Sequence, residues 1–303
     1  MVFPLGRLLA FAVLLAPFAR AADGPPARPA AAPPPPPPPS PELAAKCQAL
    51  LDTWKARFDE EQMNYLVAPP FVIAGNGTAE EVRQYRDRTI LAAAKCLQKQ
   101  FFKKQPTEPV LILLFEREGI YKRLAKKWFD DDDVPYYGFF RHDNVMLMNV
   151  GTGTGTLVHE LTHALIKPDF PDVPSWFNEG LASLYEQCSL AIDDTIWGHE
   201  NWRLPALQKA IAAKTLRPLE ELIRDDEFYK AENVGLNYAQ ARYLMYYLQE
   251  KKLLRKYYEQ FRDNAKDDPT GLDTLKKLVG PASLADFETQ WREWVMTLKF
   301  RSR

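Results

Sequence analysis

The chain has 303 residues, of which 46% are hydrophobic and 12% aromatic, enough apolar material for a sizeable core. Lysine and arginine (39) almost balance aspartate and glutamate (40), which leaves a formal net charge of -1. Because neither sign of charge predominates, the composition argues against a nucleic-acid-binding protein and against attraction to an anionic membrane surface.

Residues 1–22 have the pattern of a secretory signal. Arg7 precedes the apolar run Leu8–Ala16, and Ala19 and Ala21 form a small-x-small cleavage pattern. The apolar run is too short to span a bilayer, and no later stretch of the sequence is long and apolar enough to do so. We therefore expect an exported protein, periplasmic or secreted, without a transmembrane segment in the mature chain.

Residues 23–41 are rich in alanine and proline, and Pro33–Pro39 is an unbroken proline run. Such a run lacks backbone donors and adopts the stiff polyproline II conformation. It is either a stalk that precedes the folded part or a docking site for a proline-binding partner.

Residues 42–105 predict an N-terminal helical hairpin. After a loop over residues 68–77, Thr78-Ala79-Glu80-Glu81 has the form of a capping box that opens the second helix. Apolar residues recur at helical spacing in the first helix, namely Leu43, Cys47, Leu50, Trp54 and Phe58.

The hairpin would bring Cys47, near the start of its first helix, close to Cys96, near the end of its second. In an oxidising compartment a Cys47–Cys96 disulfide is then expected, which would leave Cys188 unpaired. Three cysteines are too few for a disulfide framework, and no C-x-x-C pair is present.

Residues 106–200 combine strand and helix patterns. The continuous apolar run Val110–Phe115 predicts a buried strand, a helix follows over residues 120–128, and residues 136–140 and 144–150 predict a β-hairpin. We expect the strand Asn144–Asn149 to form the edge that pairs with an extended peptide. The Gly-Thr repeat over 151–156 lacks the ending of a phosphate-binding loop and predicts a flexible lead-in to the next helix.

That next helix contains the sequence His159-Glu160-Leu161-Thr162-His163, which fits H-E-x-x-H. Residues four apart point the same way on a helix, so His159 and His163 can bind one metal ion together. Glu160 can reach a metal-bound water as general base. The chain has only four histidines, and two of them occur in this register.

A catalytic zinc site needs a third protein ligand, and Glu179 is the candidate. It lies on a new helix that opens after a loop punctuated by Pro168, Pro171 and Pro174. The remainder of the chain has helical periodicity near residues 175–188, 203–213, 237–250, 252–264, 271–279 and 283–298.

The motif His159-Glu160-x-x-His163 followed by Trp176-x-x-Glu179-Gly180-x-Ala182 resembles the gluzincin metallopeptidases, and most of all exported bacterial peptidase-MA-like proteins of largely unassigned substrate. The resemblance is specific over about residues 134–190. It implies that His159, His163 and Glu179 bind zinc, that Glu160 is the general base and that the fold is zincin-like.

The segment Leu236-Asn237-Tyr238-Ala239-Gln240-Ala241-x-x-Leu244 resembles the part of M1-type enzymes that donates a hydrogen bond to the oxyanion. This resemblance nominates Tyr238, with His199 and His142 as alternatives. Two departures stand out. No G-x-M-E-N segment, with which M1 aminopeptidases hold a substrate amino terminus, precedes the metal helix. Ser183 replaces the aspartate that orients a ligand histidine in thermolysin-like enzymes.

The expected fold is therefore α+β and mainly helical, with a small mixed sheet packed on the metal-site helix. Its parts are a signal peptide, a linker, a helical hairpin, a catalytic core (106–200) and a helical C-terminal part (201–303). The expected function is a zinc-dependent peptidase that acts on a peptide or protein substrate through zinc-bound water activated by Glu160. The alternative is a catalytically silent zincin-fold binding or scaffold protein of the cell envelope.

Overall fold

The computed structural model describes residues 40–230, 232–280 and 283–300, all of which belong to one compact unit. The expected signal peptide and most of the expected linker lie outside the described residues. The linker ends where Ser40 caps the first helix, accepting a hydrogen bond from the Leu43 backbone N–H at 3.1 Å, and Pro41 occupies the first helical position.

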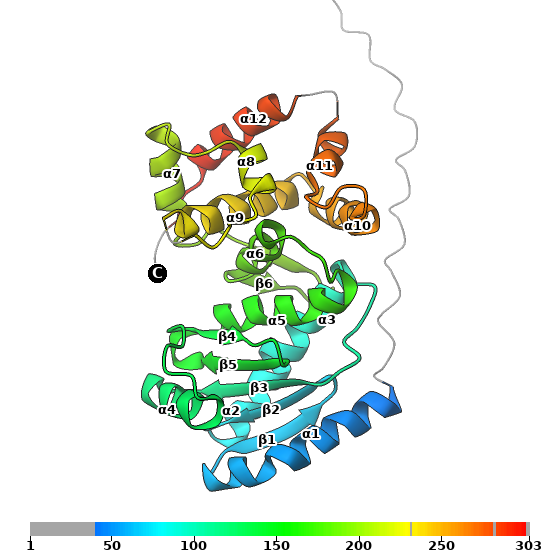
Figure 1. The fold of residues 1–303 in the computed structure, drawn as a ribbon, viewed down its shortest axis with the longest axis vertical. Helices are drawn as coiled ribbons and strands as arrows, with labels where there is room; N and C mark the ends of the chain where they lie inside the picture. The colour runs from blue at the N-terminus through cyan, green and yellow to red at the C-terminus, as the bar shows by residue number, and fades with distance from the viewer. Residues whose placement is uncertain (1–39, 231, 281–282, 301–303) are drawn as a thin grey trace, which may run out of the picture. The chain divides into compact units, whose positions relative to one another are not determined.

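The helices and strands follow the order drawn in Figure 1. The helices are α1 (Pro41–Glu60), α2 (Ala79–Gln84), the π-helix η1 (Tyr85–Leu91), α3 (Ala92–Gln100), α4 (Glu118–Phe129), the 3-10 helix η2 (Val150–Thr152), α5 (Gly155–Asp169), α6 (Ser175–Leu184), α7 (Leu204–Ala212), α8 (Leu219–Arg224), α9 (Val234–Glu250), α10 (Leu254–Asn264), α11 (Leu272–Val279) and α12 (Leu284–Thr297). The strands are β1 (Asn64–Ala68), β2 (Phe71–Gly75), β3 (Val110–Phe115), β4 (Gly138–Phe140), β5 (Val145–Asn149), β6 (Cys188–Leu190) and β7 (Ile196–Gly198).

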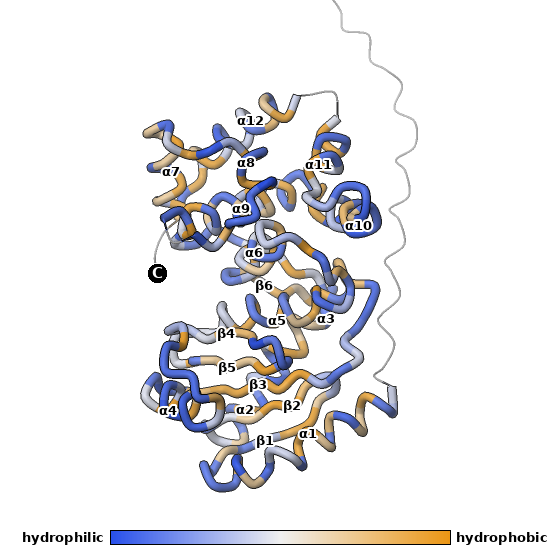
Figure 2. The backbone as a smooth tube through the Cα atoms, viewed as in Figure 1, coloured by the Kyte–Doolittle hydropathy of each residue, from blue (hydrophilic) through white to orange (hydrophobic). Residues whose placement is uncertain are grey.

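The first five strands form one mixed sheet in the order β1-β2-β3-β5-β4. The pairs β2–β3 and β3–β5 are parallel, and the outer pairs β1–β2 and β4–β5 are antiparallel. The central strands are covered on both faces, which explains why β2, β3 and β5 are continuous apolar runs (Figure 2). The expected α+β class, mainly helical with a small mixed sheet, is confirmed.

The sheet separates two layers of helices. Alternate strand residues such as Val72 and Leu111 pack with α1 and α4 on one face. Their neighbours Ile73 and Ile112 pack with α3 and α5 on the other face, because strand side chains alternate across a sheet. The metal-motif helix α5 therefore lies directly on the sheet.

This arrangement overturns the expected N-terminal helical hairpin. The segment between the two helices, which its proline, glycine and asparagine content marked as a loop, contains strands β1 and β2. Cys47 on α1 and Cys96 on α3 consequently belong to the cores on opposite faces of the sheet, and both thiols are free. The Cys47–Cys96 disulfide prediction is wrong.

The predicted strand–turn–strand over residues 136–150 is present as β4 and β5, but the expected edge strand is not the one observed. Strand β5 is paired on both sides, to β3 and to β4, so β4 forms the edge. Tyr137 O and Arg141 N bond to β5. Because facing groups alternate along an antiparallel strand, the N–H and C=O groups of Gly138 and Phe140 point away from the sheet.

Beyond α6 the chain is mostly helical, as expected, with the addition of the small hairpin β6–β7 and the short helix α8. Helices α6 and α9 pack closely where a Cβ on Gly180 would lie 3.0 Å from the backbone oxygen of Ala241. The expected helices of this region appear as α7 and α9–α12. Within the residues that the structure describes, no helix combines the length and the apolar character needed to cross a membrane.

A buried carboxylate, Asp169 at the end of α5, connects three parts of the fold. It accepts hydrogen bonds from the backbone N–H groups of Lys103 and Lys104 at 2.9 and 2.7 Å, after α3. It also accepts from the Tyr258 hydroxyl at 2.7 Å and from Arg262 at 2.8 Å, both on α10. Because one side chain accepts all four hydrogen bonds, the end of α5 is fixed against the segment after α3 and against α10.

Candidate metal centre

Helices α5 and α6 bring three metal-ligating side chains together. His159 and His163 lie one turn apart on α5, and α6 returns against α5 with Glu179 facing them. Buried apolar residues on both sides of the motif, including Leu157, Leu161 and Phe177, fix the helices against the core. The ligand atoms of His159, His163 and Glu179 all lie within 4.8 Å of one another. The predicted ligand group is therefore assembled.

The distances within this group suit a shared cation. His159 Nε2 and His163 Nε2 lie 3.0 Å apart, and Glu179 Oε2 lies 3.2 Å and 3.6 Å from them. His159 and Glu179 are 7% and 6% exposed, and Glu179 Oε2 accepts no well-formed hydrogen bond. A buried carboxylate oxygen normally has a hydrogen-bond donor, and this one has two imidazole nitrogens beside it instead. Two imidazole nitrogens and one carboxylate oxygen form a donor set that suits zinc.

The charges of the site require a positive group at this point. Burial acts to lower the pKa of His159, but the neighbouring carboxylates of Glu179 and Glu186 outweigh burial and raise it. Burial acts to raise the pKa of Glu179, but the two imidazoles outweigh burial and hold it far below its ordinary value. A proton or a divalent cation would satisfy this demand, and a cation would satisfy both nitrogens and the carboxylate together.

Each imidazole has an oxygen atom near its far nitrogen. His163 Nδ1 lies 2.9 Å from Asn178 Oδ1, at hydrogen-bond distance, and His159 Nδ1 lies 3.3 Å from Glu186 Oε1, an ion-pair contact without a well-formed hydrogen bond. When Nδ1 carries the proton and donates it to these acceptors, both Nε2 lone pairs face Glu179, as metal binding requires. Neither acceptor was anticipated from the sequence.

Glu186 is in turn held by its own partners. Its carboxylate pairs with Arg203, at 2.8 Å for Nη2–Oε1 and 3.2 Å for Nε–Oε2, and accepts from Asn201 Nδ2 at 3.0 Å. Its side chain is 7% exposed. Ser183, the position at which thermolysin-like enzymes carry the orienting aspartate, has an Oγ without a hydrogen-bond partner. Glu186 therefore contacts His159, whereas the Ser183 hydroxyl contacts no polar group.

A phenol holds the second oxygen of the carboxylate ligand. The Tyr229 hydroxyl donates to Glu179 Oε1 at 2.8 Å. This contact leaves Oε2 as the oxygen that faces the two histidines. Tyr229 lies in the irregular segment between α8 and α9, where no periodic pattern marks it in the sequence.

Glu160 lies beside the ligands in a cleft of about 790 Å³. Burial raises the pKa of Glu160, against the opposing effects of His159, His163 and a backbone hydrogen bond from Phe140. The edge strand β4 thus contacts the carboxylate through an outward-facing N–H group. A carboxyl group with a raised pKa is a stronger proton acceptor than one at its ordinary value.

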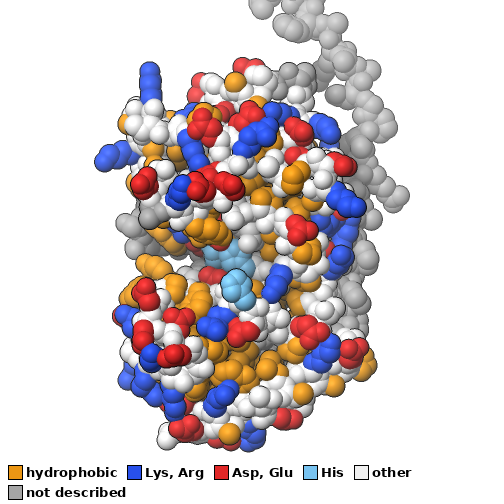
Figure 3. Space-filling view, viewed as in Figure 1, with side chains coloured by type: hydrophobic (Ala, Val, Ile, Leu, Met, Phe, Trp, Pro, Cys, Tyr) orange, Lys and Arg blue, Asp and Glu red, His pale blue; other side chains and the backbone are white. Residues whose placement is uncertain are grey.

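The cleft is bounded by β4, by the start of α5 and by residues near α7 and α9. Its lining consists of Pro135, Tyr137, Gly138, residues 152–156, Val158, His159, Glu160, residues 185–188, Trp202, Arg203 and Tyr238. In the space-filling view, histidine side chains are visible in a hollow midway along the molecule, with hydrophobic side chains beside it (Figure 3).

Of the three candidate oxyanion donors, Tyr238 lines this cleft. Its ring stacks on the Arg203 guanidinium, whose carbon lies 4.9 Å from the ring centroid. His199 hydrogen-bonds to Ser189 Oγ at 2.9 Å, and His142 lies in the exposed β4–β5 turn; neither belongs to the cleft lining.

The Gly-Thr segment brings α5 close to the orienting glutamate. A Cβ on Gly155 would lie 2.3 Å from the backbone oxygen of Glu186, so only glycine permits this approach. The segment predicted as a flexible lead-in therefore includes a position at which α5 contacts the loop that carries Glu186.

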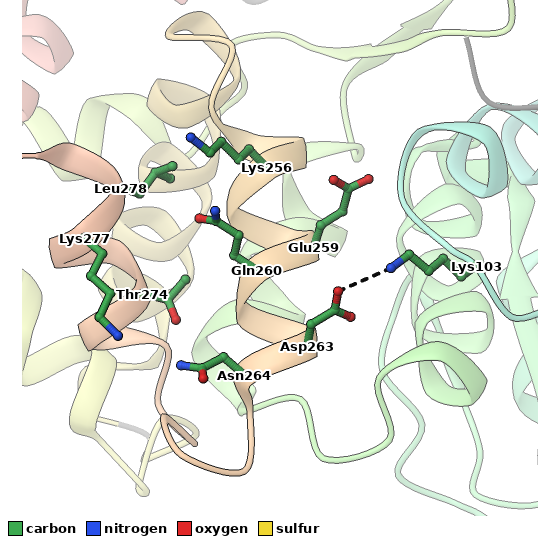
Figure 4. A pocket seen from close by; sticks show the side chains of 9 residues that line it. All are labelled: Lys103, Lys256, Glu259, Gln260, Asp263, Asn264, Thr274, Lys277 and Leu278. Atoms are coloured by element: carbon green, nitrogen blue, oxygen red, sulfur yellow. Dashed lines mark hydrogen bonds and ion pairs between the residues drawn. The ribbon is translucent and has the colours of Figure 1, made fainter. Parts of the chain in front are cut away.

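A second hollow, of about 600 Å³, lies between α10 and α11 and does not include the metal ligands. Its lining includes charged side chains of both signs, and Lys103 points across to Asp263 at 3.3 Å (Figure 4). None of its residues belongs to the candidate metal group.

Comparison with known sequences adds one family. The sequence model of a family described as "Protein of unknown function (DUF1570)" matches residues 153–270. The match covers less than half of the chain, but it includes the metal ligands, Glu186, Arg203 and Tyr238. It begins after the last strand of the mixed sheet. No curated protein matches the chain.

Proposed function

We propose that this protein is a zinc-dependent peptidase with a zincin-like fold of the gluzincin type. The observation that carries the proposal is the convergence of His159, His163 and Glu179, with Glu160 beside them in a cleft. The mixed sheet with an antiparallel edge strand next to the motif helix is consistent with that fold.

His159 Nε2, His163 Nε2 and Glu179 Oε2 would hold the zinc ion. Zinc in a His-His-Glu site keeps one position open, lowers the pKa of a coordinated water and polarises a carbonyl oxygen. Asn178 and Glu186 would accept from the Nδ1–H groups of the two imidazoles and so select their tautomers, and Tyr229 fixes the orientation of the Glu179 carboxylate. The donor set and the acceptors behind it therefore fit the ion.

The remaining chemistry belongs to the chain itself. Glu160 accepts a proton from the attacking water and later delivers it to the leaving amine. The Tyr238 hydroxyl, whose pKa burial raises, stays protonated and donates to the oxyanion of the tetrahedral intermediate. The outward-facing backbone groups of Gly138 on β4 align an extended peptide along the cleft.

Peptide hydrolysis by the zinc-loaded protein and by the Glu160→Gln variant tests this proposal. We expect the variant to retain stoichiometric zinc and to lose activity by at least about 100-fold, because general-base catalysis typically contributes that much. Glu118→Gln at the half-exposed start of α4 is the matched control and should keep full activity. A zinc-loaded wild-type protein that hydrolyses no peptide would instead support the scaffold alternative.

We also propose that the protein is exported through residues 1–22. Amino-terminal sequencing of the protein recovered outside the cytoplasm should begin close to Ala22. Recovery of the intact Met1 terminus in the cytoplasmic fraction would contradict export.

A further inference from the structure

Two of the charged groups that line the cleft neutralise each other, and the third is Glu160. Apart from the ligand His159, the described lining residues with a carboxyl or guanidinium group are Glu160, Glu186 and Arg203. Glu186 and Arg203 form a two-bond pair with each other, at 2.8 and 3.2 Å. Glu160 serves as the base in the proposed function.

A peptidase that acts at a chain end must recognise the charge at that end. An amino terminus needs a free carboxylate, and a carboxyl terminus needs a free cation, because an unpaired terminal charge is costly to bring into a cleft. Among the described residues that line the cleft, no lysine is present, and the arginine is committed to Glu186. Glu160 is taken up by its role as the base, so the lining lacks an uncommitted charged group that could anchor either terminus.

The walls of the cleft instead carry accessible aromatic surface. Tyr137, before β4, is 55% exposed, and Trp202, before α7, is 53% exposed. Val158 and Tyr185 also line the cleft, although their side chains are almost wholly buried. Aromatic side chains that remain this exposed beside a reactive centre can bury a large apolar group of a ligand.

We infer that the site takes an internal, uncharged stretch of peptide with a large apolar or aromatic side chain next to the bond that is cut. This inference rests on the proposed function and adds the substrate class to it. Tyr137 and Trp202 bury the apolar side chain, and chain ends make no contribution to recognition.

A matched set of synthetic peptides tests the inference. Each peptide carries phenylalanine, leucine, aspartate or lysine at its centre and is made with free ends or with an acetyl and an amide cap. We expect the zinc-loaded protein to cut phenylalanine and leucine peptides beside the central residue, with capped and free forms hydrolysed at similar rates. Cleavage restricted to free-ended peptides, or a preference for the charged centre, would overturn the inference.

A tryptophan variant locates the apolar contact. Trp202→Ala should lower kcat/KM for the phenylalanine peptide by roughly 10- to 100-fold, the usual range for loss of an apolar pocket contact, with zinc content unchanged. Trp197→Ala on β7, which is 39% exposed and outside the cleft lining, is the control and should behave as wild type. Equal effects of the two substitutions would contradict the assignment.

Binding to the zinc-loaded Glu160→Gln variant separates the two proposals. If the wild type cuts nothing, the proposed function fails, but tighter binding of the capped phenylalanine peptide than of the aspartate peptide would still support the inference. Equal binding of the two capped peptides would overturn the inference, whatever the activity.

Discussion

Replacement of Glu186 by alanine should separate the orientation of His159 from the direct binding of zinc. The substitution removes the carboxylate oxygen 3.3 Å from His159 Nδ1 and leaves the three proposed zinc ligands, His159, His163 and Glu179, in place. Loss of a group that orients a metal-bound imidazole typically weakens metal binding by about 10- to 100-fold. We expect a loss in that range, measured by zinc titration against a competing chelator.

The same substitution should also destabilise the metal-free protein. Arg203 would lose its carboxylate partner, and an uncompensated buried charge typically costs about 3–5 kcal/mol. The Arg203 side chain is 22% exposed, so partial hydration reduces the expected loss to about 2–3 kcal/mol. Urea unfolding of the metal-free protein measures this loss.

Two further variants distinguish orientation from general damage. Adding Arg203→Ala to Glu186→Ala should recover part of the stability but not the zinc affinity, because the acceptor for His159 stays absent. Ser183→Ala should change neither, since the Ser183 hydroxyl makes no hydrogen bond. Unchanged zinc affinity in Glu186→Ala, or a marked loss in Ser183→Ala, would refute the orienting role of Glu186.

Three other predictions concern the proposed oxyanion donor Tyr238, the close packing at Gly155 and the surface ion pairs of Glu61. In steady-state assays, Tyr238→Phe should lower kcat by about 100- to 1000-fold, which is the usual effect of losing an oxyanion donor. KM and zinc content should change little. Gly155→Ala should lower the free energy of unfolding in urea by about 1–3 kcal/mol and weaken zinc binding, because the added Cβ would lie 2.3 Å from the Glu186 carbonyl oxygen. Gly119→Ala is the control and should have neither effect, because the space around Gly119 is open. Hydrogen bonds from Arg123 and Lys127 on α4 lower the pKa of Glu61 from 4.5 to about 2. The contribution of Glu61 to the free energy of unfolding is therefore present above pH 4.5 and is lost as the pH falls toward 2. Glu61→Gln should therefore cost about 0.5–1 kcal/mol at pH 7 and progressively less at acid pH, and a constant difference across that range would contradict the assignment.

The sequence predicted those parts of the fold whose pattern is local. Val110–Phe115 is a strand over the predicted residues, and the capping box at Thr78 forms as expected, with the Glu81 carboxylate 2.7 Å from the Thr78 backbone nitrogen. The convergence of His159 and His163 was also predictable, because helical geometry places residues four apart on the same face.

The parts that were missed depend on contacts distant in sequence. Strand β2 lies between a proline pair and a glycine-rich turn, and such flanking residues are typical of a loop. The short apolar run becomes a strand because it pairs with β3, which is distant in the sequence. Glu186 meets His159 only after α6 has ended and the chain has turned back, and its partner Arg203 comes from beyond the β6–β7 hairpin. Asn178 had one available signal, its position directly before Glu179.

The four hydrogen bonds to Asp169 have a consequence for folding cooperativity. They join the segment after α3, the end of α5 and helix α10, so the last turn of the metal helix is completed by residues nearly a hundred positions downstream. The C-terminal helices cannot be removed without leaving a buried carboxylate short of donors. We therefore expect the sheet, the metal helix and the C-terminal helices to unfold together in a single transition, which makes the metal centre a property of the whole folded unit and not of a detachable core.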